Sequence, residues 1–147
     1  MSGLEQTILI AQLASTLPLV GLIWTIQLVH YPLFARVPEP GFSTYQHEHM
    51  RRITWIVFPL MMVELASSIG LVALRPDSLL AILGMALVVG IWCSTAFIQV
   101  PCHRDLAERF DREVHDRLVG SNWIRTIAWT ARGVVVLVMV AAVLGTG

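Results

Sequence analysis

Residues 99–132 read QVPCHRDLAERFDREVHDRLVGSNWIRTIAWTAR, a charged stretch that begins where one apolar run ends and finishes inside the next. It holds two of the five histidines, five of the ten acidic residues and six of the ten arginines. Such a stretch separates two helices. It also brings together, in one part of the chain, side chains that can bind a ligand or transfer protons. The predicted fold and the predicted site are both organised around it.

The composition is that of an integral membrane protein. Hydrophobic residues make up 56% of the 147 residues and charged residues 14%, whereas soluble domains carry about 25% charged residues. The formal net charge is zero, so the charge balance by itself says nothing about nucleic acid, and we expect no nucleic-acid partner. We expect a single integral membrane domain over residues 1–147, with the lipid bilayer as its first partner.

Four apolar segments are each long enough to cross a bilayer as a helix, which takes about 20 residues. They span residues 8–29, 53–74, 79–100 and 123–144. The link between the second and third segments is short, and Asp77 or Ser78 is the predicted N-cap of the third helix. The sequence therefore predicts an all-α fold, a four-helix transmembrane bundle made of two αα-hairpins.

The two long polar links, residues 30–52 and 101–122, are predicted to contain helix. Ser43 and Gln46 have the spacing of a capping box, so the second helix is expected to start near Thr44. In the second link four apolar residues recur at every fourth position: Leu106, Phe110, Val114 and Leu118. This stripe predicts an amphipathic helix before the fourth span, lying on the membrane surface or capping the bundle.

Four spans place both termini on one side of the membrane and both long links on the other. The link side carries eight arginines: Arg36, Arg51, Arg52, Arg104, Arg109, Arg112, Arg117 and Arg125. The other side carries only Arg75. The positive-inside rule therefore predicts cytoplasmic links and both termini outside.

The two halves of the chain resemble each other. Gln27 and His30 end the first span, as Gln99 and His103 end the third. An arginine and a tryptophan four residues apart follow later in each half. Because the first and third spans run in the same direction, we expect a parallel repeat. It brings all five histidines to the link side of the membrane.

This gathering of histidines predicts a metal or haem site at the link side, because imidazole and carboxylate bind iron, copper or zinc. The expected donors are His30, His49, His103, His115 and Asp111. His49 is preferred to His47 as the inward residue, because its helical azimuth is closer to that of Glu64. The alternative is that these histidines hydrogen-bond lipid headgroups, loops or water.

Glu64 and Arg132 fall within the depth of the lipid. Ionisable residues at that depth face the bundle interior and usually pair, so we expect Glu64 to compensate Arg132. Arg125 lies seven residues before Arg132 on the same helix face, nearer the interface. These three residues are the candidate catalytic residues, and the alternative is a structural ion pair that locks two helices together.

The motifs QVPCHRDL and NWIRTIAWTAR resemble those of the anthrone-oxygenase-like family of small four-helix membrane proteins. Members end the third span with a polar-x-Pro-x-polar motif and a leucine, matched here by Gln99, Pro101, His103 and Leu106. They open the fourth span with asparagine, tryptophan and arginine, matched here by Asn122, Trp123, Arg125, Trp129 and Arg132. The family prefers asparagine where this chain has Gln99 and His103. The resemblance implies oxygenation of polycyclic phenolic substrates, as in a few members.

We therefore predict a membrane-embedded, metal- or haem-dependent oxidoreductase or oxygenase that acts on a lipophilic small molecule at the cytoplasmic end of the bundle. Residues expected to contact the cofactor are Gln27, Gln99, Asn122 and Trp129. Two alternatives stay open. One is a non-catalytic membrane protein, either a small transporter protomer that forms a homo-oligomer or an accessory subunit. The other is a cofactor-free oxygenase with His103 or His115 as its base.

Overall fold

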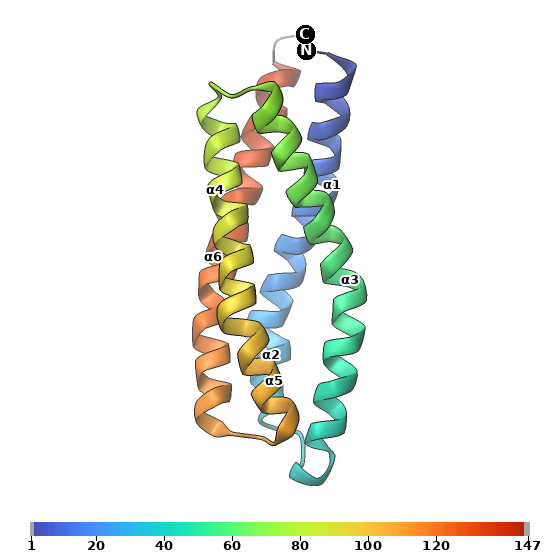
Figure 1. The fold of residues 1–147 in the computed structure, drawn as a ribbon, viewed down its shortest axis with the longest axis vertical. Helices are drawn as coiled ribbons and strands as arrows, with labels where there is room; N and C mark the ends of the chain where they lie inside the picture. Colours follow the sequence, from blue (N-terminus) through green and yellow to red (C-terminus); the bar gives the residue numbers. More distant parts are fainter. Residues whose placement is uncertain (1, 146–147) are drawn as a thin grey trace.

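The computed structural model describes residues 2–145, so residues 1, 146 and 147 of the predicted domain lie outside the described part. The described chain is a bundle of helices (Figure 1). Its elements in chain order are α1 (Gly3–Thr25), η1 (Ile26–His30), α2 (Tyr31–Phe34), α3 (Glu39–Leu74), α4 (Leu79–Ser94), η2 (Thr95–Gln99), α5 (Val100–Glu108) and α6 (Arg112–Leu144). The segments η1 and η2 are π-helical.

These elements form four long helices, because η1 joins α1 to α2 and η2 joins α4 to α5 without a break. The four helices, Gly3–Phe34, Glu39–Leu74, Leu79–Glu108 and Arg112–Leu144, are each long and apolar enough to cross a membrane. The predicted four-helix bundle is confirmed. All four helices extend beyond the predicted spans into the polar links, which shrink to residues 35–38 and 109–111.

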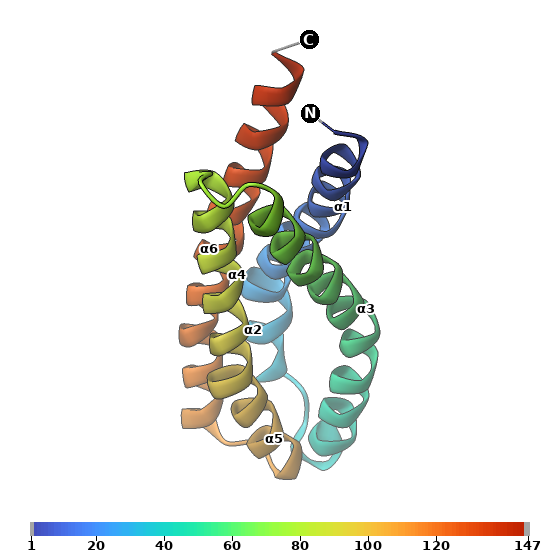
Figure 2. The ribbon, with the colours of Figure 1, turned by 45° about the horizontal axis from the view of Figure 1, so that its top comes forward.

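The beginning of α1, the end of α6 and the α3–α4 turn lie at one end of the bundle (Figure 1). Residues 35–38 and 109–111 lie at the opposite end, which we call the link end. Helix α1 packs against α3 and α6, and α6 also packs against α4. Figure 2 shows α3 standing apart from α4 and α5 over part of its length. Which side of the membrane the link end faces stays a prediction.

Side-chain caps fix two of the helix starts. The Ser78 hydroxyl accepts a hydrogen bond from the Ala81 N–H at 3.3 Å, which confirms the predicted cap of α4. Asp111 Oδ1 accepts from the N–H groups of Glu113 and Val114 at 2.9 and 3.1 Å and so caps α6. The carboxylate thereby satisfies N–H groups that have no partner within the helix.

The predicted capping box at Ser43 is wrong. Helix α3 begins at Glu39, and Pro40 in its first turn has the backbone angle that a helix start needs. The Ser43 hydroxyl instead donates to the carbonyl oxygen of Ala107 at 2.6 Å. This bond ties the start of α3 to α5 at the link end.

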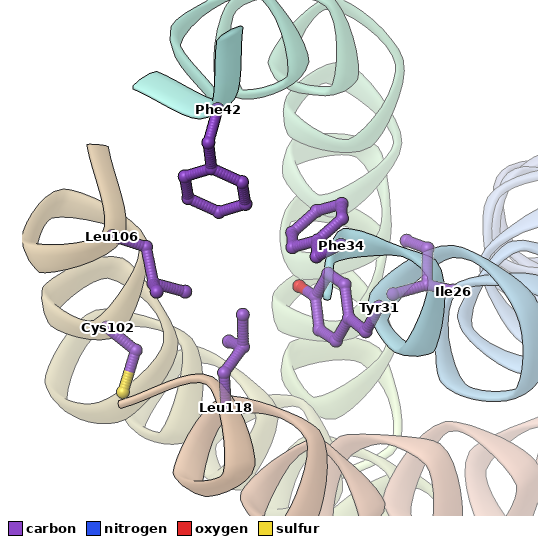
Figure 3. Packing of buried hydrophobic residues seen from close by; sticks show 7 residues of the cluster. All are labelled: Ile26, Tyr31, Phe34, Phe42, Cys102, Leu106 and Leu118. Atoms are coloured by element: carbon purple, nitrogen blue, oxygen red, sulfur yellow. The ribbon is translucent and has the colours of Figure 1, made fainter. Parts of the chain in front are cut away.

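The predicted amphipathic segment is divided between two helices. Leu106 lies in α5 and Leu118 in α6, while Phe110 lies in the break between them. The chain folds back at that break, so both leucines join one buried cluster at the link end. Figure 3 shows them with Phe34 and Phe42, the side chains pointing toward one another from α2, α3, α5 and α6. The stripe therefore caps the bundle, which is one of the two predicted roles.

Each π-helical segment lies just before a proline. Pro32 and Pro101 are the second residues of α2 and α5. A proline within a helix has no N–H to donate, and its ring clashes with the carbonyl four residues earlier. The wider π turn lets the helix continue through the proline, and Gln27 and Gln99 in these segments are buried. The sequence repeat itself stays a prediction.

Arg132 on α6 and Glu64 on α3 form a buried ion pair, with Arg132 Nε 3.9 Å from Glu64 Oε1. This confirms the predicted pairing. Arg132 Nη2 also donates to Gln12 Oε1 at 2.7 Å and to the Ser68 hydroxyl at 2.9 Å. The guanidinium thus connects three helices, α1, α3 and α6.

Glu64 is held from two further directions. Its Oε1 accepts from the Thr16 hydroxyl at 2.9 Å, and its Oε2 accepts from the indole N–H of Trp129 at 3.1 Å. Both carboxylate oxygens therefore have donors inside the protein, as a buried charge requires.

Gly84 on α4 makes room for the Arg132 guanidinium. A Cβ at this position would lie 2.8 Å from Arg132 Nη1, and hydrogen bonds hold that side chain in place. We expect Gly84→Ala to lower the free energy of unfolding by about 1–3 kcal/mol, as overpacking of a core does. The control is Gly90→Ala on the same helix, where nothing lies within 4 Å of the new Cβ. Unfolding in detergent micelles measures both variants, and equal stabilities would contradict the role of Gly84.

Candidate functional site

A cavity of about 430 Å³ lies between α3 and the continuous helix α4–η2–α5. Its wall is polar toward the link end, where it is formed by Tyr31, His49, Thr95, Gln99, His103 and Arg125. Farther from the links the wall is apolar, formed by residues such as Val57, Phe58, Met61 and Trp92. Ligand sites in proteins have this volume and this combination of a mostly apolar wall with a few polar groups.

The hydroxyl group of Tyr31 is the centre of the polar wall. It lies 2.8 Å from His103 Nε2, and Arg125 Nη2 donates to it at 3.2 Å. The amide nitrogen of Gln46 lies 2.7 Å from His103 Nδ1. An amide N–H₂ only donates, so Nδ1 accepts and neutral His103 carries its proton on Nε2. Nε2 then donates to Tyr31.

The hydroxyl hydrogen of Tyr31 is consequently free to form a hydrogen bond with another group. A phenolic oxygen accepts two hydrogen bonds and donates one, and His103 and Arg125 supply the two that it accepts. With His103 protonated on Nε2, no group within residues 2–145 accepts a hydrogen bond from Tyr31. Because Tyr31 lines the cavity, this hydrogen can be donated to a ligand.

Arg125 is a buried cation whose partners are all neutral. Its Nε and Nη2 donate to Asn122 Oδ1 at 3.0 and 2.6 Å, and its Nη1 donates to the Thr95 hydroxyl at 3.3 Å. The side chain is 6% exposed, and among the described residues no carboxylate lies within ion-pair distance of it. Asn122 is held in turn by Gln27, whose Oε1 accepts from the Asn122 amide at 2.8 Å.

His49 offers the cavity a free ring nitrogen. Its Nδ1 lies 2.9 Å from His30 Nε2, so the two rings share one hydrogen bond. Its Nε2 has no hydrogen-bond partner in the described part of the chain. His49 lines the cavity and is buried, whereas His47 is exposed, which confirms the predicted choice between them. In the tautomer in which its Nδ1–H donates to His30 Nε2, His49 has an Nε2 that can take up a proton from a ligand.

The five predicted metal ligands do not come together. Asp111 caps α6, and His115 Nε2 bonds to the carbonyl oxygen of Tyr31 at 2.9 Å. Both ring nitrogens of His103 and one each of His30 and His49 are directed at each other, at Tyr31 or at Gln46. Within residues 2–145 no three histidine, cysteine or acidic side chains are placed to hold a metal ion. This arrangement of donors does not fit a metal ion.

The other predicted site residues are divided between two places. Arg125 and Gln99 line the cavity, and Gln27 and Asn122 support Arg125 from behind. Glu64 and Arg132 lie deeper, in the ion pair. Trp129 separates the two groups, because its indole N–H bonds to Glu64 while the Arg125 guanidinium lies 5.8 Å from its ring centre.

Three residues of this site were not predicted from the sequence: Tyr31, Gln46 and Trp92. Tyr31 stands between His30 and Pro32, and Gln46 was assigned to a helix cap. The signal for Tyr31 was its place beside Pro32, just after the first span, since a proline there disturbs the helix and π turns occur frequently at functional sites. Nothing in the sequence distinguished Trp92 from the other four tryptophans.

Comparisons of this chain with protein-family models, with curated proteins and with solved structures gave no match. The resemblance to the anthrone-oxygenase-like family is therefore still an expectation.

The hydrogen-bond pattern predicts a specific tautomer for each of two histidines. His103 carries its proton on Nε2, because Gln46 donates to Nδ1. His47 carries its proton on Nδ1, because that nitrogen donates to the Ser43 carbonyl at 2.8 Å. Nitrogen NMR of histidine-labelled protein should show the two opposite tautomers, and Gln46→Leu should remove the preference at His103 only. A His103 ring protonated on Nδ1 would overturn the assignment of the Tyr31 hydrogen.

Proposed function

We propose that this protein is a membrane-embedded oxidoreductase, an oxygenase that acts on a lipophilic small molecule in the cavity beside α3. The observation that carries the proposal is the polar wall of that cavity. It combines a proton acceptor at His49 with two donors, Tyr31 and Arg125, at the end of an otherwise apolar space. This set removes a proton from a bound molecule and stabilises the negative charge that results.

The first step is a proton transfer. His49 Nε2 takes a proton from a carbon next to a carbonyl group of the ligand, and the electron pair of the broken C–H bond moves onto the carbonyl oxygen as an enolate. General-base catalysis of this kind typically contributes about 10²–10⁴-fold to the rate. The hydroxyl hydrogen of Tyr31 and the second N–H of Arg125 Nη1 donate to that oxygen. Donors already in place stabilise the developing charge more than water does.

The second step uses dioxygen, which dissolves in lipid. The enolate carbon transfers electrons to dioxygen and a C–O bond forms, while the proton held by His49 passes to the outer oxygen to give a hydroperoxide. Loss of water leaves a new carbonyl group. One methylene group and one dioxygen are thus converted into one carbonyl and one water, the substrate being oxidised and dioxygen reduced. The resemblance to the anthrone-oxygenase-like family favours this chemistry over a simple isomerisation.

The proposal includes no metal or haem step, because other protein groups engage most ring nitrogens of the candidate ligands and, within residues 2–145, no three candidate donors are placed to hold a metal ion. His103 has the role of a positioning residue. Its Nε2–H occupies one acceptor site of the Tyr31 oxygen, which leaves the hydroxyl hydrogen for the ligand.

A carrier that binds the same molecule without changing it is the second candidate. The observation that favours it is that the cavity wall includes residues exposed on the outer surface of the bundle. A ligand can therefore leave through the same opening without having been changed. Binding without oxygenation would support this candidate, which corresponds to the transporter protomer or accessory subunit expected as the alternative.

The enzyme proposal is tested with an anthrone as substrate, isotopically labelled dioxygen and protein in lipid nanodiscs. Mass spectrometry should find one labelled oxygen in the product. His49→Gln should lower the turnover by about 10²-fold or more, because the base is lost. Tyr31→Phe should lower it by about 10²–10³-fold, because one donor to the enolate oxygen is lost.

Each variant has a matched control on the same chain. His47→Gln removes an exposed histidine two residues away, and Tyr45→Phe removes a hydroxyl that makes no hydrogen bond within residues 2–145. Both controls should keep the turnover of the unchanged protein. Equal activity of His49→Gln and His47→Gln would show that His49 is not the base.

A further inference from the structure

The bundle interior has an unbalanced positive charge. Of the acidic and arginine side chains in the described residues, only Glu64, Arg125 and Arg132 are buried. Glu64 pairs with Arg132, which leaves the charge of Arg125 without a counter-charge. A buried charge with no partner is costly, and a charged residue at membrane depth usually pairs. The missing partner is therefore expected in the cavity that Arg125 lines.

The hydrogen-bonding groups of the cavity show the same imbalance. The Tyr31 hydroxyl hydrogen and the second hydrogen of Arg125 Nη1 have no acceptor in residues 2–145. The indole nitrogen of Trp92, a wall residue, is also buried without a partner there. The free acceptor positions are fewer: His49 Nε2 and the hydroxyl oxygen of Thr54, which donates to the Met50 carbonyl and accepts no hydrogen bond within residues 2–145. A wall with more donors than acceptors fits a ligand rich in acceptor oxygens.

The cavity opens sideways, toward the surroundings of the bundle. Four of its wall residues are exposed on the outer surface: Thr54, Phe58, Ala96 and Val100. They belong to α3 on one side and to η2 and α5 on the other. None of them is charged, and Thr54 and Phe58 lie within one of the apolar helices that can cross a membrane. The opening therefore faces lipid.

We propose that the ligand is bound with one negative charge on an oxygen held by Arg125 and Tyr31, and that it reaches this position from the bilayer through the opening between α3 and η2–α5. The ligand class is a lipophilic acid: an enol, a phenol or a carboxylic acid that is uncharged in lipid and ionised in the site. Its apolar body lies toward Met61 and Trp92. This inference rests on the proposed function only for the use of the same cavity.

Two fluorescent probes of nearly the same shape test the charge: pyrenecarboxylate, an anion, and acetylpyrene, which is uncharged. Calorimetric titration of the protein in nanodiscs, with empty nanodiscs subtracted, gives both affinities. The carboxylate should bind about 10- to 100-fold more tightly, as hydrogen bonds between charged groups contribute. Arg125→Gln should remove this preference, mainly by weakening the binding of the carboxylate.

Two further variants test whether the preference for the carboxylate depends on Arg125 itself or on any positive charge of the protein. Arg117→Gln removes an exposed arginine of α6 and should keep the preference for the carboxylate. Arg125→Lys keeps the charge and should keep part of the preference, even if Arg125→Gln does not fold. A preference that survives in folded Arg125→Gln would overturn the assignment of the anion to Arg125.

The route is tested by closing the opening. Ala96→Trp fills the space between α3 and η2 and should slow the association of both probes at least about tenfold in stopped-flow fluorescence. Ile124→Trp adds the same bulk on the outer surface of α6, away from the cavity, and should have no effect. Equal rates in the two variants would refute the lateral route.

The outcomes also separate this inference from the proposed function. If the unchanged protein binds both probes equally and still oxygenates its substrate, the charge assignment is wrong and the proposed function stands. If it binds the carboxylate tightly but oxygenates nothing, the inference stands and the carrier role replaces the enzyme.

Discussion

Two guanidinium groups inside an apolar bundle are the constraint on which the rest of this structure depends. Arginine keeps its proton even when buried, so every Arg125 and Arg132 N–H needs an acceptor from the surrounding helices. Arg132 finds a carboxylate, an amide and a hydroxyl on α1 and α3. Arg125 finds only neutral oxygens. The contacts of Arg132 hold α1, α3 and α6 together, and the contacts of Arg125 leave a positive charge that can act on a ligand.

The two π-helical segments make the arrangement around Arg125 possible. Without a wider turn, Pro32 and Pro101 would end or kink their helices. With it, the helices continue toward the link end and carry Tyr31 and His103 to the same level as Arg125. Single π turns of this kind occur frequently at functional sites. Here the two turns and the polar wall of the cavity belong to one structural unit.

The charged stretch that separates the third and fourth spans contributes less chemistry than its composition indicated. Most of its charged groups lie on exposed faces of α5 and α6 or cap a helix. Its functional residues are His103, at one end, and Arg125 and its support Asn122, near the start of the apolar part of α6. The stretch also supplies Leu106 and Leu118, which close the bundle at the link end.

Much of the fold could be predicted because hydropathy and helix caps are local properties. The four apolar segments, the Ser78 cap and the inward face of His49 all follow from spacing along one helix. The Glu64–Arg132 pair was also predictable, because a charge within lipid requires a partner and the chain offers few. The metal prediction rested instead on proximity, and helices can bring histidines to the same level while their ring nitrogens bond to other groups.

The sequence by itself determined the number of helices and the burial of Glu64 and Arg132, since both follow from the cost of placing polar groups in an apolar surrounding. Only the tertiary structure decided the site. The gap between α3 and α4–α5, and the choice of Tyr31 as the group that joins His103 to Arg125, depend on how four helices pack and on where the π turns direct their side chains. Those are contacts between residues far apart in the chain, and no local pattern specifies them.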